Sequence, residues 1–151
     1  MIMGVWGITN LENDTAQDWL VEVGEDFVSA QEYVEMILQE EDFIDDEESF
    51  ITLAVLELME QHLSSSDFDK NAFLQKFPKD FIFSVIKASK KILYFENHSE
   101  LRELWQESDE YEQWKTHQDS LISCIKYFLE KYEIRKIDNA RPGTTWSLLD
   151  D

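Results

Sequence analysis

The sequence contains a single cysteine, Cys124, among its 151 residues, together with only two prolines and four glycines. One cysteine excludes an internal disulfide and a cysteine-rich zinc site. No apolar run approaches the roughly 18 residues that a membrane-spanning helix needs, and no basic stretch followed by an apolar one stands at the start of the chain. We therefore expect a protein of the reducing cytoplasm that does not bind membranes.

Lysine and arginine are absent from residues 1–69, and the first basic side chain is Lys70. Residues 1–69 hold 19 Asp and Glu, whereas residues 70–151 hold 14 acidic and 13 basic residues, so the net charge of −20 belongs almost entirely to the first part. Such a surface repels nucleic acid and attracts cationic partners, although a run of charges is also typical of a solvated face. The later bases alternate with acids and form no stripe for a phosphate backbone, so we expect no nucleic-acid binding.

The high charge does not indicate a disordered chain, because 43% of the residues are hydrophobic and 13% are aromatic. The length fits one domain over residues 1–151 that can bury a real core. Apolar residues recur at helical spacing along most of the chain, and no strand pattern competes with them. The sequence therefore predicts an all-α fold, a single compact helical domain of five to seven helices.

The helices are predicted over about residues 14–23, 30–39, 46–63, 79–94 and 108–133, with short helices before Pro78 and after residue 98. The helix over 46–63 is apolar over so broad a surface that we expect it at the centre of the core, with Leu56 buried there and Phe128 buried on the last long helix. Gly24 is placed to end the first helix. Predicted N-terminal capping residues are Asp14 with Gln17, Ser29 with Glu32, Asn97 with Glu100, and Ser108.

Two segments outside the helices complete the prediction. Residues 1–13 form an N-terminal loop. Residues 134–151 form a non-periodic tail, which we expect to dock on the core because Trp146, Leu148 and Leu149 are too apolar for a free end.

The chain offers few groups for catalysis. None of its three histidines, His62, His98 and His117, has the spacing of a zinc or di-iron site. Cys124 lies on the apolar stripe of the last helix and is expected to be an inert core thiol; a Cys–His pair with His117 lacks a visible third group. The carboxylates at 45–48 do not follow a calcium-loop pattern, and Gly4 with Gly7 lacks the rest of a phosphate loop. We expect no catalytic residues, no metal and no cofactor.

The start of the chain is its most distinctive stretch. "MGVWGITNLENDTAQDWL", from Met3 to Leu20, resembles the opening of an uncharacterised bacterial family, domain of unknown function 4259, whose members begin with Gly-x-Trp-Gly followed by Glu-Asn-Asp and Ala-x-Asp. "SELRELWQESDEYEQW", from 99 to 114, is similar to a later segment of that family. The resemblance implies a small helical bacterial protein whose natural start is Met3. It supplies no catalytic residues.

Two interpretations of this opening stretch remain. In the structural one, the glycines allow tight turns, Trp6 and Leu11 pack as a lid, and Asn13 or Asp14 caps the first helix. In the functional one, an aromatic side chain beside polar groups on a loop forms a recognition patch. That patch consists of Trp6, Glu12, Asn13, Asp14 and Asp18.

The leading functional hypothesis is a non-enzymatic acidic binding protein, an immunity or antitoxin-like inhibitor that occludes the active site of a basic bacterial toxin such as a nuclease. A helical scaffold or adaptor is the alternative, and a carboxylate-based metal-dependent hydrolase is a third. The partner-binding surface is predicted over residues 1–69. It centres on a run of acidic side chains that we expect to be exposed: Glu40, Glu41, Asp42, Asp45, Asp46, Glu47 and Glu48.

Overall fold

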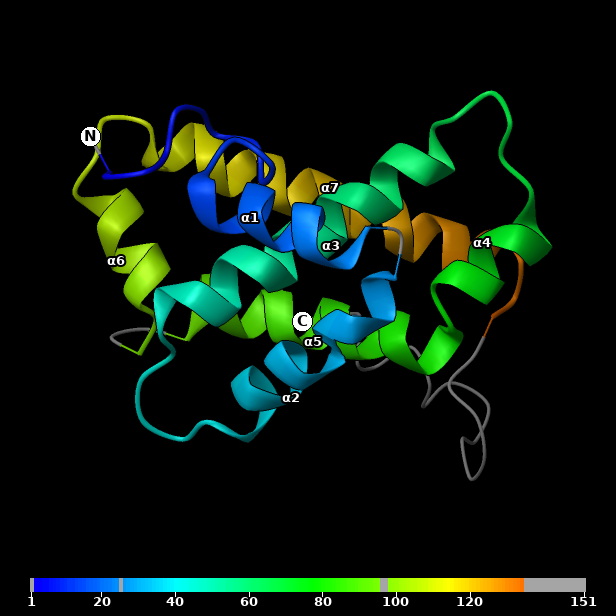
Figure 1. The fold of residues 1–151 in the computed structure, drawn as a ribbon, viewed down its shortest axis with the longest axis horizontal. Helices are drawn as coiled ribbons and strands as arrows, with labels where there is room; N and C mark the ends of the chain where they lie inside the picture. Colours follow the sequence, from blue (N-terminus) through cyan, green and yellow to red (C-terminus); the bar gives the residue numbers. More distant parts are fainter. Residues whose placement is uncertain (1, 25, 96–97, 135–151) are drawn as a thin grey trace.

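Helices make up the regular structure of the chain in a computed structural model that describes residues 2–24, 26–95 and 98–134 (Figure 1). Within these ranges the only β pairing consists of two isolated bridges, Val5–Asn13 and Ile44–Ser99. The predicted all-α class is therefore confirmed. The helices are α1 (Asp14–Val23), the 3₁₀ helix η1 (Phe27–Ala30), α2 (Gln31–Gln39), α3 (Asp46–Leu63), α4 (Lys70–Lys76), α5 (Lys79–Tyr94), α6 (Glu100–Gln106) and α7 (Tyr111–Lys131).

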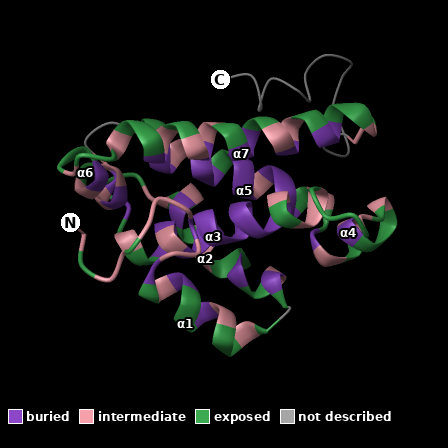
Figure 2. Ribbon diagram, turned by 90° about the horizontal axis from the view of Figure 1, so that it is seen from above, coloured by how far each residue is buried: buried purple, intermediate pink, exposed green. Residues whose placement is uncertain are grey.

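Helix α3 is the centre of the domain, as its broad apolar surface predicts. Eleven of its eighteen residues are buried. It packs against α1, α2, α5, α6, α7 and η1, and Figure 2 shows α7 on one side of it and α1 on the other, with their buried faces turned inward. Leu56 is completely buried and Phe128 nearly so, which confirms both as core residues.

The predicted helix bounds agree closely with the structure, but several predicted caps are wrong. The capping box of Asp14 with Gln17 does not form; instead Asn13, the other candidate of the structural interpretation, caps α1. Its Oδ1 accepts from the Ala16 N–H at 2.8 Å, while Gln17 donates its side-chain N–H to Leu11 O. Ser29 lies within η1, which runs directly into α2. Ser108 donates to Trp105 O and closes α6, so that α7 begins only at Tyr111.

Two other expectations concern residues that the structure does not describe. Helix α6 is capped by Ser99, whose Oγ accepts from the Arg102 N–H at 3.3 Å, whereas the cap predicted from sequence, Asn97, falls outside the described residues. The expected docking of the tail with Trp146, Leu148 and Leu149 also lies outside them.

Candidate functional site

The opening loop is closed by backbone hydrogen bonds between its two limbs. The Asp14 N–H donates to Gly4 O at 2.8 Å, and the Trp6 N–H donates to Glu12 O at 3.0 Å. Gly4 has a φ of 76°, which L side chains rarely adopt. A Cβ on Gly7 would lie 2.3 Å from the Glu12 carboxylate. The two glycines therefore serve the turn itself, as the structural interpretation predicts.

The residues of the expected recognition patch differ in their surroundings. Trp6 is 56% exposed, so it does not pack as the expected lid, and Asp14 and Asp18 are exposed as well. Glu12 is half-buried and accepts hydrogen bonds from the Thr9 N–H and hydroxyl at 3.2 and 2.6 Å, which turns its carboxylate back into the loop. The buried Asn13 serves as the cap of α1. Of the patch, the side chains of Trp6, Asp14 and Asp18 are exposed to solvent.

A buried polar network fastens this loop to α3 and α7. The Asn10 backbone N–H donates to Glu57 Oε1 at 2.9 Å, and its side-chain amide exchanges two hydrogen bonds with the amide of Gln118, at 2.7 and 2.8 Å. Glu57 Oε1 also accepts from His117 Nε2 at 2.8 Å. Asn10, Glu57 and Gln118 are all buried. One carboxylate oxygen thus joins the loop to the two longest helices.

The hydrogen bond that His117 donates to Glu57 raises the pKa of His117, against the opposing effect of burial, and the charges of Glu57, Glu60 and Glu12 add to the increase. Sequence analysis did not identify this pair. Glu57 stands between two buried leucines on a helix that packs against neighbours on every side. This apolar context was the signal in the sequence from which the burial of Glu57 could have been predicted. The pair does not extend to Cys124, whose half-buried position raises the pKa of its thiol and disfavours the thiolate.

The acidic segment, residues 40–48, is held in place at both of its ends. Lys91 Nζ donates to Ile37 O at 2.8 Å and to Glu40 O, at the C-terminus of α2. Further on, Ile44 is fully buried. The Ile44 N–H donates to His98 O at 2.6 Å, and Ile44 O accepts from the Glu100 N–H at 2.9 Å. The segment is therefore anchored to α5 and to the start of α6.

The acidic side chains of this segment are not all exposed. Glu41, Asp42, Asp45 and Glu47 are exposed, and Glu40 and Asp46 are half-buried. Glu48 is buried, and desolvation raises its pKa; the backbone N–H groups of Glu48 and Asp45 oppose this increase. The expectation that Glu48 is a surface residue is therefore wrong. It lies in the first turn of α3, beside the backbone N–H groups of the helix start.

Carboxylates from three helices also act together on Tyr33 of α2. Burial raises the pKa of Tyr33, and the charges of Glu47, Glu22, Glu32 and Glu48 raise it further. These residues come from α1, α2 and the first turn of α3. Carboxylates of three different helices are thus close enough to act on one side chain.

The model of the family described as domain of unknown function 4259 matches residues 4–117, more than half of the chain. The protein belongs to this family. The comparison with curated proteins and the comparison with solved structures each give no match. In this family member the opening loop and the segment 99–114 lie together, because Val5 and Trp6 share the walls of one small hollow with Trp105 and Ser108.

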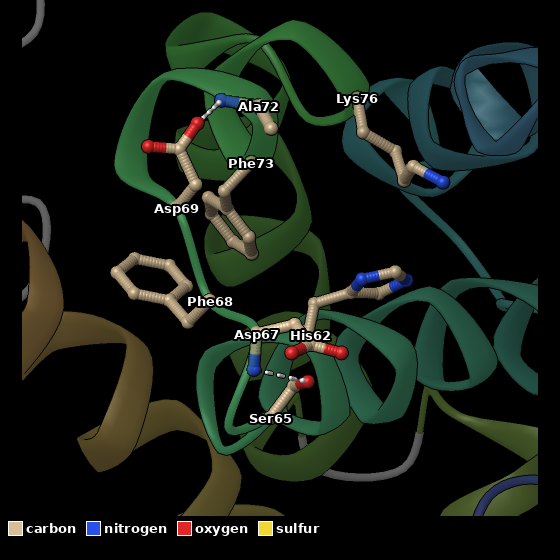
Figure 3. Close-up of a pocket in the computed structure, with 8 residues that line it drawn as sticks. All are labelled: His62, Ser65, Asp67, Phe68, Asp69, Ala72, Phe73 and Lys76. Atoms are coloured by element: carbon tan, nitrogen blue, oxygen red, sulfur yellow. Dashed lines mark hydrogen bonds between the residues drawn. The ribbon is translucent and has the colours of Figure 1, made fainter.

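A hollow of about 230 Å³ lies between the end of α3 and α4 (Figure 3). Its polar groups have structural roles: Asp69 caps α4 by accepting from the Ala72 N–H at 3.0 Å, and Lys76 Nζ lies 5.6 Å from the centre of the Phe27 ring. Phe68 and Phe73 form its apolar side and both contact Phe128. The packing of α4 against its neighbours therefore accounts for these residues of the hollow.

Among residues 2–24, 26–95 and 98–134, no group of three or more His, Cys, Asp or Glu side chains is placed to hold a metal ion. No helix in those ranges is long and apolar enough to cross a membrane.

Proposed function

We propose that this family member is a non-enzymatic binding protein that neutralises a basic toxin, such as a nuclease, by covering the site where the toxin holds nucleic acid. The observation that carries the proposal is the acidic segment. Its backbone is fixed by Lys91 and Ile44, while the side chains of Glu41, Asp42, Asp45 and Glu47 extend to solvent. A pre-arranged surface loses little conformational entropy when a partner binds.

An aromatic side chain within the segment supports the same proposal. Phe43 is 40% exposed between Asp42 and the buried Ile44. Charged rims mainly raise association rates, whereas aromatic anchors supply much of the affinity. The segment offers both kinds of contact within a few residues. Met36 on the preceding helix, 46% exposed, adds further apolar surface.

The partner is sought first, by using the purified protein to capture proteins from its native host at low salt. We expect a basic protein whose toxic activity stops when the two are mixed in equal amounts. Recovery of no basic protein, or of one whose activity continues in the complex, would contradict the proposal.

The steering role is tested with the triple variant Asp42→Lys, Asp45→Lys and Glu47→Lys. Glu48 is left unchanged because it is buried. The matched control reverses three exposed acids of the second half, Asp109→Lys, Glu112→Lys and Glu130→Lys, which gives the same net charge. At low salt the first variant should associate about tenfold more slowly than the control, since local carboxylates steer encounter more than total charge does. Equal rates in stopped-flow measurements would place the steering surface elsewhere.

A further inference from the structure

A groove lies beside the last two turns of α7, where the end of α3 and the loop before α4 meet this helix. It measures about 170 Å³. Four of its residues are three or four positions apart on α7 and therefore share one face of the helix. We call it the α7 groove, and the described residues that line it are Leu63, Phe68, Cys124, Tyr127, Phe128, Lys131 and Tyr132.

Aromatic rings form the floor of the α7 groove. The ring centre of Phe68 lies 5.9 Å from that of Phe128 and 6.4 Å from that of Tyr132, and the last two rings are 5.2 Å apart. Tyr127 is 66% exposed at the edge. An apolar surface of this kind is typical of a place where another segment packs.

The charge of the groove restricts the kind of segment that fits it. None of the described residues that line it is acidic. Lys131 and Lys70 both stand over the Tyr132 ring, with Nζ 5.5 and 5.4 Å from its centre. Burial and the charge of Glu60 raise the pKa of Cys124, so the cationic part of the groove is its Lys131 end. An apolar segment that finishes in acidic residues is complementary to this arrangement.

The described chain turns back at the end of α7, next to the groove. Glu133 has a φ of 54°, in the left-handed region that residues other than glycine seldom adopt. The Ile134 N–H donates to Leu129 O at 2.9 Å, the hydrogen bond that closes a left-handed helix end. Ile134 then packs against the core. The chain therefore leaves α7 beside Tyr132, one wall of the groove.

The sequence beyond Ile134 contains a segment with the required chemistry. Residues 135–151 lie outside the described part of the chain, and they finish in "WSLLDD", in which apolar side chains precede two aspartates. Trp146 is about twelve residues beyond Ile134, a stretch that spans about 40 Å when extended, whereas the groove extends only about 12 Å along the helix. The Pro142–Gly143 pair favours the turn that a return path needs.

We propose that residues 146–151 dock in the α7 groove of their own chain. The Trp146 indole packs on the aromatic floor beside Tyr127, and Asp150 and Asp151 lie near Lys131. The docked segment covers the thiol of Cys124 and closes an apolar surface to other proteins. This inference goes beyond the proposed function and does not depend on it, since it requires no partner.

Cys124 can report on this contact, because it lines the groove and is the single cysteine of the chain. The measurement is the rate at which the uncharged reagent N-ethylmaleimide alkylates the full chain under native conditions. Trp146→Ala should react about tenfold faster than the wild type, because the thiol no longer depends on local opening of the tail. Trp6→Ala truncates an exposed tryptophan near the start of α7 and should react at the wild-type rate. Equal rates in the wild type and Trp146→Ala would overturn the proposal.

A second variant leaves Trp146 in place and changes only the acidic end. Asp150→Lys with Asp151→Lys should react about threefold faster, since the attraction to Lys131 becomes repulsion. The matched control, Asp109→Lys with Glu112→Lys, changes the net charge equally at the other end of α7 and should keep the wild-type rate. If hydrogen exchange of the α3 amides shows that Trp146→Ala opens the whole fold, this pair of variants decides. Equal rates in the two would then contradict the docking.

The other possible occupant of the groove is a second copy of the chain. A tail that docks on its own chain gives an alkylation rate that does not change with protein concentration. A wild-type rate that rises on dilution would show that another copy covers Cys124, and the proposal would be wrong. The search for a toxin partner would be unaffected by either result.

Discussion

Glu57 is the residue through which the opening loop depends on the core. Its Oε1 accepts from both the Asn10 N–H and His117 Nε2. Because this carboxylate raises the pKa of His117 in the folded protein, the protonated ring contributes stability that is fully present below the ordinary histidine pKa of about 6.5 and is lost as the pH rises through the higher folded pKa. We therefore expect the free energy of unfolding, measured with urea at pH 6, 7 and 8, to decrease with rising pH for the wild-type protein relative to His117→Gln.

The comparison with His117→Gln is needed because acidic conditions also relieve repulsion between the many carboxylates. That effect is common to both proteins, so it cancels in the difference. A difference that is constant from pH 6 to pH 8 would mean that the hydrogen bond to Glu57 does not depend on the charge of the ring.

At the scale of elements, apolar spacing predicted the helices well because burial of one stripe decides where a helix persists. The bounds of α3 and α5 agree with the predicted 46–63 and 79–94. Caps were predicted less well. A serine is compatible with several positions near a helix end, and the backbone conformation decides which one it takes. Ser29 lies in a 3₁₀ helix, and Ser108 closes the helix before it.

The candidate site was the least predictable part, because side chains that are usually exposed become buried where helices meet. Glu48 and Glu57 carry charge in the sequence yet are buried on α3. The network of Asn10, Glu57 and Gln118 joins residues up to 108 positions apart, and no local pattern marks such a partnership. The acidic composition did predict the exposed carboxylates of the segment 40–48 correctly at Glu41, Asp42, Asp45 and Glu47.

The central place of α3 predicts how the helices respond to truncation of their side chains. Leu56→Ala and Phe128→Ala should each lower the free energy of unfolding by about 2–5 kcal/mol, because both leave a cavity that tightly packed neighbours fill only in part. Val21→Ala on α1, where the side chain is 85% exposed, is the control and should change it by less than about 0.5 kcal/mol. Chemical denaturation provides the measurement, and a change near zero at Leu56 would contradict the central role of α3.

The whole molecule carries its charge unevenly, and this unevenness should be visible in its stability. Residues 1–69 contain 19 acidic and no basic residues, and carboxylates of α1, α2 and α3 jointly raise the pKa of Tyr33. Their mutual repulsion opposes folding and is screened over a Debye length of about 30 Å at 0.01 M salt but only about 10 Å at 0.1 M. The melting temperature should therefore rise as the sodium chloride concentration is increased from about 10 to about 200 mM, the range over which exposed charges become screened.

The source of that rise can be traced to the acidic segment with variants of matched charge. The Asp42→Lys, Asp45→Lys, Glu47→Lys variant should show a smaller increase with salt than the Asp109→Lys, Glu112→Lys, Glu130→Lys control. It removes like charges from the part of the chain that has no basic residue, whereas the control changes residues 70–151, where 14 acids and 13 bases nearly balance. The partly buried His117–Glu57 pair is screened less and should not reverse the trend. Choline chloride should act like sodium chloride if screening is the cause. A melting temperature that falls with either salt, or that rises equally in both variants, would mean that repulsion within the acidic half does not limit the stability of the fold.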